Sequence, residues 1–395
     1  MRNDMKSRGN NVFSNNKHRI YFSICGEGYG HSSRELAIAG QLKRRGADIL
    51  MGSYGYVLER LKKSFDSIEL KREFEMVGDK GSFDIGATIK KSRKTAMQFS
   101  SIIKEEKKAI EKFNATCVVA DGRTAAIFAA FQLGLPCVNV SNQTSLEPFF
   151  KDSNFLVRLI GKPVEFTMQT ATTLAEVTLI PDLSPPDTVC LASLGKSRHI
   201  MKKQCFVGPV VSSEFFEVSN AVDIKSHFIL ILLGGHSFRY PIFENILKIA
   251  DQFPGVDFLI FTKFKSDHYP PNVKVSEFAK DISSYMKAAD MIITQAGHST
   301  AMEILTTGKP ALIIPDKGQI EQENNARRMK ELGTCETLDY DSLDPESLSS
   351  KIRDLLNDRK YCEKAVLYSE MSKNMKGPQR SADIIMELSR RTQCY

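Results

Sequence analysis

The chain has 395 residues, of which 42% are hydrophobic and 26% charged, which fits two globular domains and excludes a disordered protein. A formal net charge of +7 suits anionic partners such as nucleotides or acidic lipids, without choosing among them. The first 18 residues are polar, and no later run approaches the roughly 20 apolar residues of a membrane span. We therefore expect a disordered tail at residues 1–18 on a cytoplasmic protein.

Eight cysteines occur without any C-x-x-C pair, and several lie in apolar runs such as TCVVAD. This pattern excludes a zinc site or a disulfide framework and predicts buried, reduced thiols. We expect no bound metal.

From residue 19 to 207, short apolar runs such as RIYFSIC and TCVVAD alternate with amphipathic runs such as SSRELAIAGQLKRRG. The alternation pauses over a turn-rich stretch, 208–226, and restarts over 227–374. Alternating strands and helices are typical of a doubly wound parallel sheet. The sequence therefore predicts two Rossmann-like domains, a linker at 208–226, and an amphipathic helix at 375–395 whose docking surface it does not specify.

The first predicted strand ends in a glycine turn, GEGYGH, before a helix. Such turns let a ligand approach the backbone, and the helix N-terminus favours a phosphate. A dinucleotide fingerprint would have glycine in place of His31 and an acidic residue after the second strand, where this chain has ILMGS. NAD is therefore disfavoured, and the missing G-x-x-x-x-G-K-[ST] motif excludes an ATPase site of that kind.

The second domain carries the most specific pattern, at residues 289–333. A strand leads to Gly297, and Ser299 opens a helix on which Glu303 lies one turn later on the same face. Helix N–H groups suit a diphosphate, and a carboxylate one turn deeper suits the two ribose hydroxyls. An ordinary capped helix is the alternative at this point. The following cluster EQENN, with its carboxylate and amide groups, is suited to a sugar.

These motifs resemble glycosyltransferase family 28. The GG turn at 234–235, SEF at 276–278, AGHSTAMEIL at 296–305 and EQENNA at 321–326 are similar to its donor domain. GEGYGHSSRELAIAGQL resembles its acceptor-side loop, whereas residues 55–115 match little. The resemblance is to uncharacterised archaeal-type members and, more distantly, to the peptidoglycan lipid-intermediate N-acetylglucosaminyl transferase.

The resemblance implies a GT-B fold, in which two Rossmann-like, doubly wound α/β domains face a cleft. It also implies an inverting, metal-independent transfer of a hexose-type sugar from a UDP-sugar to an acceptor hydroxyl, with no cofactor. Two alternatives stay open: a non-hydrolysing UDP-sugar 2-epimerase, and a non-catalytic nucleotide-sugar-binding subunit.

Donor contacts carry over by resemblance. Phe278 would lie against the base, Glu303 would hold the ribose, and residues 297–300 would cover the diphosphate. Glu321 and Gln322 would contact the sugar. This chain has GGHSFRY where the family usually continues with small residues, so His236 and Arg239 either meet the diphosphate or change the exposure of the turn. The expected donor-binding set is Gly234, Gly235, His236, Arg239, Phe278, Gly297, His298, Ser299, Thr300, Glu303, Glu321, Gln322 and Asn325.

His31 and Asp121 are the expected catalytic residues. A histidine is a competent base near neutral pH, so His31 would take the proton of the acceptor hydroxyl. Its alternatives are to cap the helix or to bind a phosphate. Asp121 would orient His31 or bind acceptor hydroxyls, unless it only caps the helix from Thr124. Gly28, Gly30, Arg123, Asn142 and Gln143 are the other expected acceptor-side residues, because ligands bind beyond strand ends.

A stretch at residues 147–166, EPFFKDSNFLVRLIGKPVEF, interleaves apolar residues with cations. This pattern fits a helix on an anionic membrane surface, and it fits a helix packed on the sheet equally well. Lipid-linked acceptors in the family favour a peripheral position at the inner face of the membrane. The basic run KKSRK has no interleaved aromatic residues, so we expect no nucleic-acid partner.

Overall fold

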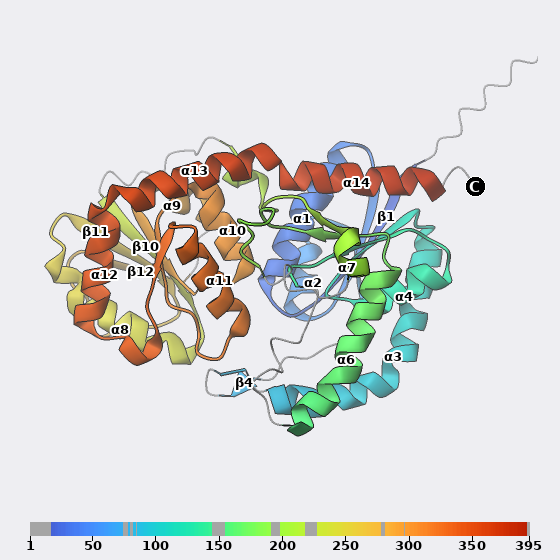
Figure 1. The fold of residues 1–395 in the computed structure, drawn as a ribbon, viewed down its shortest axis with the longest axis horizontal. Helices are drawn as coiled ribbons and strands as arrows, with labels where there is room; N and C mark the ends of the chain where they lie inside the picture. The colour runs from blue at the N-terminus through green and yellow to red at the C-terminus, as the bar shows by residue number, and fades with distance from the viewer. Residues whose placement is uncertain are drawn as a thin grey trace, which may run out of the picture.

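The computed structural model describes residues 17–73, 78–79, 82–83, 85–143, 155–190, 198–217, 227–277, 281–295 and 297–392. These residues form two lobes, each built on a parallel sheet, with a long helical band passing along both lobes (Figure 1). Of the tail expected at residues 1–18, only Lys17 and His18 fall within the described residues.

The first lobe is built on a sheet that has seven parallel strands among the described residues, in the order β3-β2-β1-β6-β7-β8-β9. Along β1, Ile20 and Phe22 point to one face of the sheet and Tyr21 to the other, with the period of two that a strand requires. Both faces are covered by helices, as a parallel sheet needs. The strands are β1 (Arg19–Ile24), β2 (Asp48–Ser53), β3 (Ser67–Glu69), β6 (Cys117–Asp121), β7 (Cys137–Val140), β8 (Val177–Ile180) and β9 (Gln204–Phe206). The helices are α1 (Tyr29–Arg44), α2 (Gly55–Leu61), α3 (Ile85–Phe113), α4 (Thr124–Gln132), α6 (Phe155–Leu174) and α7 (Arg198–Lys203), and β4 (Gly78–Asp79) and β5 (Ser82–Phe83) form a separate hairpin.

The second lobe repeats this plan with six parallel strands in its described part, in the order β12-β11-β10-β13-β14-β15. Ile229 and Ile231 of the central strand pack on one layer of helices, and Phe228 and Leu230 on the other. The strands are β10 (His227–Gly234), β11 (Val256–Thr262), β12 (Val273–Ser276), β13 (Met291–Thr294), β14 (Ala311–Ile313) and β15 (Cys335–Thr337). The helices of this lobe are α8 (Tyr240–Ile249), α9 (Ile282–Ala288), α10 (His298–Thr307), α11 (Ile320–Glu331), α12 (Pro345–Asn357) and α13 (Arg359–Met375), with short 3-10 turns η2 (Ser213–Phe215), η3 (Ser237–Arg239), η4 (Ala250–Gln252) and η5 (Tyr340–Ser342). The last helix, α14 (Gly377–Thr392), returns to the first lobe. The predicted fold class, two doubly wound α/β sheets, is confirmed.

The described part of the predicted linker is a packed crossing between the lobes. Val210 packs into the core of the first lobe, whereas Val211 and Phe215 pack into the second. The loop after β8 also reaches across, since Leu183 and Val189 belong to the second core. Residues 208–217 of the linker expected over 208–226 are therefore packed against both lobes, and the domain boundaries drawn from the sequence stay a prediction.

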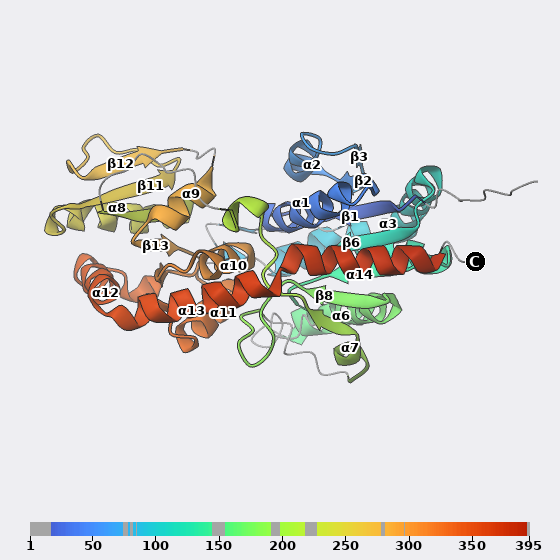
Figure 2. The same cartoon turned by 90° about the horizontal axis from the view of Figure 1, so that it is seen from above.

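The C-terminal helices form the band that spans both lobes (Figure 2). Tyr368 of α13 packs into the core of the second lobe, and Ile385 of α14 packs into the core of the first, beside α1. The docking surface that the sequence left open is therefore the α1 side of the first sheet.

The thiols depart in part from the sequence expectation. Cys362 is exposed and Cys205 is half-buried, whereas the other described cysteines, Cys25, Cys117, Cys137, Cys190 and Cys335, are buried. None of these seven described cysteines is in a disulfide. Separately, no helix within the described residues has both the length and the apolar character needed to cross a membrane.

Replacing Gly377 by alanine should destabilise the protein, because the start of α14 touches the segment that crosses between the lobes at Gly208 and Pro209. A Cβ on Gly377 would lie 2.8 Å from the carbonyl oxygen of Gly208 and closer still to that of Pro209. Overpacking against backbone costs about 1–3 kcal/mol, which urea denaturation would measure. The matched control is Gly40→Ala within α1, where the nearest atom lies 3.9 Å away and alanine should stabilise the helix by about 1 kcal/mol. Equal unfolding midpoints for Gly377→Ala and the unmodified protein would contradict this account of the junction.

Candidate functional site

The candidate site lies where α1 of the first lobe and α10 of the second begin. α1 starts after Gly28, whose φ of 90° favours glycine, and α10 starts after Gly297; neither residue caps its helix with a side chain. Gly30 packs so closely on Ser299 that a Cβ there would lie 2.6 Å from the serine Oγ. Two helix N-termini, each with a positive dipole end, therefore meet at one junction.

His31 and Asp121 form a hydrogen-bonded pair at this junction. His31 lies in the first turn of α1 with 27% of its side chain exposed, whereas Asp121, at the end of β6, is fully buried. The Nδ1 of His31 lies 2.7 Å from Asp121 Oδ1. Because an ionised carboxylate only accepts hydrogen bonds, Nδ1 carries the proton, and in the neutral imidazole Nε2 then carries the lone pair. This is the tautomer that a general base requires.

Arg34, which the sequence analysis did not select, holds Asp121 in place. Its Nε donates to Asp121 Oδ2 at 2.6 Å and its Nη2 to Oδ1, and the arginine is 4% exposed. Burial alone would raise the pKa of Asp121, but the charges of Arg34 and His31 outweigh it and keep that pKa below the usual carboxyl range. Asp121 is therefore ionised and fixed in orientation. The spacing of three residues from His31 places Arg34 on the same helical face, which is a signal in the sequence.

Glu35 is the second unselected residue of this cluster. It is fully buried, and burial, followed by the nearby charge of Asp121, raises its pKa well above the usual value. Burial and the neighbouring negative charge therefore both favour the uncharged form of this carboxyl. Arg34 is engaged by both oxygens of Asp121.

Arg123, expected on the acceptor side, is instead part of a buried network. The residue is 1% exposed, and its guanidinium donates to Glu106 Oε1 at 2.6 Å and to the carbonyl of Lys71 at 2.7 Å. The helix that follows is capped by Glu73, whose Oε1 accepts from Thr124 N at 2.8 Å. This geometry corrects the acceptor-side assignment, because a buried, fully engaged guanidinium has no surface for an acceptor. It also shows that Asp121 does not cap α4.

The other acceptor-side positions lie at the ends of β1 and β7. Asn142 is 9% exposed and Gln143 is half-buried, and both follow β7 just before residues that the structure does not describe. Gly28 and Gly30 flank His31 on the glycine turn. Of these described positions, those of the glycine turn contact the junction between α1 and α10.

On the second lobe, Ser299, Thr300 and Glu303 are half-buried on α10, and nothing lies within 4 Å of a Cβ built on Gly297. Burial raises the pKa of Glu303 to about 7, against the opposing effect of Arg60. The backbone N–H of His298 donates to Glu321 Oε1 at 3.2 Å, which brings a carboxylate to the start of α10. An anionic group therefore already occupies part of this helix N-terminus.

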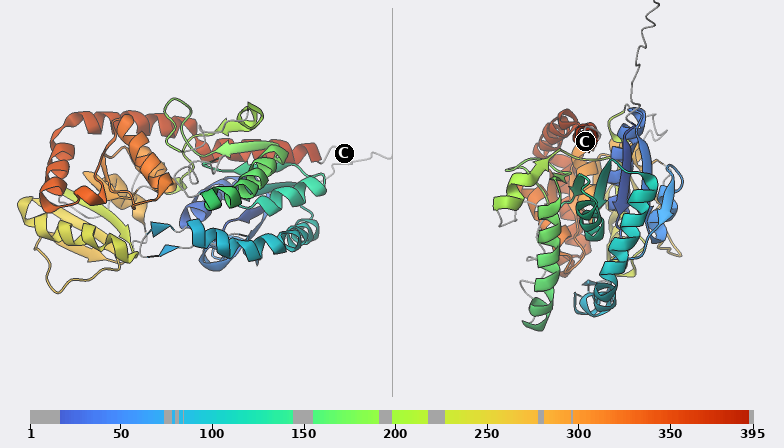
Figure 3. Two further views of the ribbon diagram at one scale, coloured as in Figure 1. Left: turned by 60° about the horizontal axis from the view of Figure 1, so that its bottom comes forward. Right: turned by 90° about the vertical axis from the view of Figure 1, so that its right-hand side faces the viewer.

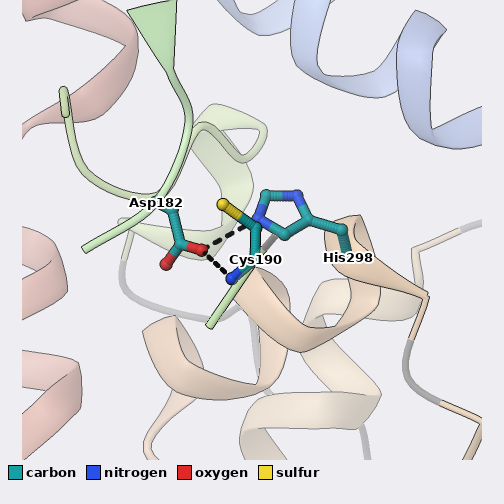
Figure 4. A group of neighbouring side chains, drawn as sticks. All are labelled: Asp182, Cys190 and His298. Atoms are coloured by element: carbon teal, nitrogen blue, oxygen red, sulfur yellow. Dashed lines mark hydrogen bonds and ion pairs between the residues drawn. The ribbon is translucent and has the colours of Figure 1, made fainter. Parts of the chain in front are cut away.

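The side chain of His298 points toward Asp182 and Cys190 of the loop after β8 (Figure 4). Its Nε2 lies 3.2 Å from Asp182 Oδ2, and that oxygen also accepts from the backbone N–H of Val189 at 3.0 Å and of Cys190 at 2.7 Å. Asp182, Cys190 and His298 bring their ligand atoms within 4.8 Å of one another, as in a metal site. Because N–H donors already satisfy the carboxylate, we interpret the group as an anchor between loop and helix.

Arg239 and Gln322 are engaged with Asp316, at the end of β14. The Nε of Arg239 donates to Asp316 Oδ1 at 2.9 Å, and Nη2 donates to Oδ2. Gln322 Nε2 donates to Asp316 Oδ2 at 3.1 Å. His236 is exposed and stacks on Phe238, with ring centroids 5.4 Å apart. The charge of Arg239 is thus neutralised within its own lobe.

Three expected donor contacts differ in accessibility. Phe278 lies outside the described residues, Asn325 is fully buried, and Gly234 forms a turn with a φ of 63° after β10. A cavity of about 500 Å³ opens at the ends of β11 and β12. Its lining includes Thr262, Phe264, Tyr269, Ser276 and Glu277.

Comparison with known sequences supports the resemblance. Residues 256–386 match the model of the glycosyltransferase family 28 C-terminal domain. An uncharacterized glycosyltransferase of Methanosarcina mazei is 33% identical over 93% of this chain and 97% of its own length. The UDP-N-acetylglucosamine–N-acetylmuramyl-(pentapeptide) pyrophosphoryl-undecaprenol N-acetylglucosamine transferase of Bacillus licheniformis is 23% identical over 94% of this chain and 98% of its own.

Solved structures agree on the fold. The calicheamicin glycosyltransferase CalG4 aligns with a TM-score of 0.72 at 18% identity, over 95% of this chain and 99% of that chain. The glycosyltransferase VinC, solved with dTDP, aligns with a TM-score of 0.67 at 14% identity, over 94% of this chain and 100% of that chain. Because these relatives are glycosyltransferases, we set aside the epimerase and the non-catalytic subunit. The chain belongs to glycosyltransferase family 28, and it is a glycosyltransferase with the GT-B fold.

Proposed function

We propose that the protein transfers a hexose-type sugar from a UDP-sugar to an acceptor hydroxyl, with inversion and without a metal. The observation that carries this proposal is the His31–Asp121 pair, at 2.7 Å, located where the first turn of α1 meets the first turn of α10. A base on one lobe then faces a diphosphate-binding helix on the other. The uridine nucleotide is supported by the name of the bacillus relative.

In the proposed displacement, the acceptor oxygen attacks C1 of the sugar and its proton passes to His31 Nε2. The bond between C1 and the diphosphate oxygen breaks, and its electron pair leaves with the diphosphate. Asp121, ionised and held by Arg34, stabilises the imidazolium that forms. The N–H groups at the start of α10 meet the departing charge, a task that a divalent cation performs in metal-dependent enzymes.

The donor contacts follow the order of groups along α10 and α11. Glu303, one turn below Ser299, would accept from the ribose hydroxyls, and the base would enter the cavity beside Ser276. Glu321 and Gln322 would face the sugar. Glu321 now accepts from His298 N, so the diphosphate would take over that hydrogen bond.

The N-terminal half of α6 is proposed as the membrane-facing surface. Leu159 is 52% and Phe166 is 72% exposed, and Lys162 is exposed between them on the same face. The C-terminal half packs into the core through Ala171. We therefore propose membrane docking for residues 159–166 and core packing for the C-terminal end of the same helix, which runs beside α3 away from the sheet (Figure 3). The name of the bacillus relative includes a pyrophosphoryl-undecaprenol-linked acceptor, which supports a lipid-linked acceptor here.

A nucleotide panel tests the donor class. At about 100 times its dissociation constant, a ligand adds roughly 2.7 kcal/mol to stability, which a thermal shift detects. We expect the largest shift with UDP among UDP, dTDP, GDP and ADP. A larger shift with one of the others would change the assigned base, and no shift with any would contradict the donor assignment.

His31→Ala should lower the turnover of the donor by about 10² to 10⁴, because general-base catalysis contributes that much. Release of UDP from a UDP-sugar that the protein turns over would measure the effect. Affinity for UDP should be unchanged, since the alanine removes no donor contact. The control is His268→Ala, an exposed histidine on the second lobe. Full turnover in His31→Ala would remove the base role.

Nucleoside binding should strengthen as pH rises from 6 to 8. Glu303 has a pKa of about 7, so it is mostly protonated at pH 6 and mostly ionised at pH 8. Only the ionised carboxylate accepts from both ribose hydroxyls, so the affinity for uridine should rise by up to about tenfold. Titration calorimetry at three pH values would measure it. Glu303→Gln should give a flat profile, and an equally steep profile in that variant would contradict the ribose contact.

Phe166→Glu should weaken binding to vesicles that contain anionic lipid, because a carboxylate replaces an aromatic ring of α6 that is 72% exposed. Co-sedimentation with the vesicles would measure the bound fraction. Leu367→Glu is the matched control, since Leu367 is 49% exposed on α13 of the other lobe. Equal losses in the two variants would argue against a specific α6 surface.

A further inference from the structure

Arg60, near the end of α2, lies against the first turn of α1. Its Nη1 donates to Ser33 Oγ at 2.9 Å, to Ser32 Oγ at 3.1 Å and to the carbonyl of Tyr29 at 3.3 Å. Its guanidinium lies 5.7 Å from the centre of the Tyr29 ring. The arginine is half-buried, and every hydrogen bond that it makes with described residues goes to a neutral oxygen.

The charge of Arg60 is not neutralised by a close carboxylate. No described carboxylate oxygen lies within 4 Å of it. Burial lowers its pKa, and the charge of Glu303 opposes this effect. The positive end of the α1 dipole lies beside the same guanidinium. A cation at that end of a helix is unfavourable, so this place favours the arrival of an anion.

The other arginines that face the site differ in this respect. Arg34 is held by both oxygens of Asp121, and Arg239 by both oxygens of Asp316. Bidentate pairing with a carboxylate satisfies the fork of each guanidinium. Among these three arginines, Arg60 is the one whose charge is available to a ligand.

Arg60 also lies on the correct side of the junction. It influences Glu303 electrostatically, and Glu303 lies one turn after Ser299 on the same face of α10. Ser299 in turn packs on Gly30, between the residues of α1 that Arg60 contacts. Arg60 therefore faces the α10 surface on which the donor is proposed to lie.

We propose that Arg60 is a catalytic residue that binds the donor diphosphate from the first lobe and takes up its charge as it leaves. The inference rests on the proposed function, since it needs a nucleoside diphosphate at α10. In the step, C1 gains a bond to the acceptor oxygen and loses its bond to the diphosphate oxygen. The electron pair stays on the diphosphate, beside Arg60, and the acceptor proton goes to His31 Nε2.

This arrangement couples leaving-group departure to the meeting of the two lobes. The second lobe binds the nucleotide, but one cation for the diphosphate comes from the first. The donor is thus fully activated only where His31 is also present. Unproductive hydrolysis on a separated lobe is thereby slowed.

A binding series tests Arg60 without knowledge of the acceptor. Uridine, UMP and UDP would be titrated into the unmodified full-length protein, Arg60→Ala, Arg60→Lys and the control Lys62→Ala, an exposed lysine just after α2. If a nucleoside diphosphate other than UDP gives the largest thermal shift, the nucleoside, monophosphate and diphosphate of that base replace these probes. We expect Arg60→Ala to weaken UDP binding at least tenfold more than uridine binding, because the loss of Arg60 raises the pKa of Glu303 and so affects both ligands to the same extent. Arg60→Lys should be intermediate and Lys62→Ala unaffected.

The outcomes of this series distinguish the role of Arg60 from the proposed function. Unchanged UDP binding in Arg60→Ala would overturn the role of Arg60 and leave the proposed function intact. An equal loss of uridine and UDP binding would also overturn it, because the effect would then be structural. No binding of any nucleoside diphosphate by the unmodified protein would overturn the proposed function and, with it, this inference.

Discussion

The buried ion pair between Arg34 and Asp121 is the interaction on which the site depends. A carboxylate with no exposed surface is costly unless it is paired and hydrogen-bonded, and here the guanidinium satisfies both oxygens. The pair fixes α1 to the end of β6, and the same carboxylate then accepts from His31. Burial and the charge of Asp121 both raise the pKa of Glu35, which disfavours a second negative charge in the cluster. The orientation of His31 is therefore a consequence of how α1 is held.

The second constraint is the connection between the lobes. The packed segment around Val210, the loop anchored by Asp182 and the α13–α14 band all cross from one core to the other. Gly30 and Ser299 meet because these crossings bring the lobes together. Residues from α1 and α10 form one site only as long as that packing holds.

The sequence predicted the fold class and the local motifs, because alternating strands and helices and a glycine turn are signals within short windows. It did not predict pairings between distant residues. The strand-end rule placed Arg123 near a ligand, yet the rule does not say whether a side chain turns outward or into the core. His298 was likewise expected to contact the donor, whereas its side chain is bound to a loop more than 100 residues earlier in the sequence. Arg60 belongs to no motif, and only its contact with α1 shows its position.

The structure divides the charges of the proposed reaction between the lobes. Proton acceptance belongs to the first lobe, where a buried ion pair fixes the base, and nucleotide binding belongs to the second, where Glu303 titrates near neutral pH. Neither half-site is complete. Without α1, α10 offers helix N–H groups to the diphosphate but no base, and without α10, α1 offers a base but no bound donor. Because Arg60 lies on the base side and faces the donor side, the cation and the base are carried by neighbouring helices of one rigid lobe. Any movement that brings one of them to the donor therefore brings the other, so that leaving-group stabilisation and proton removal become available in the same conformation.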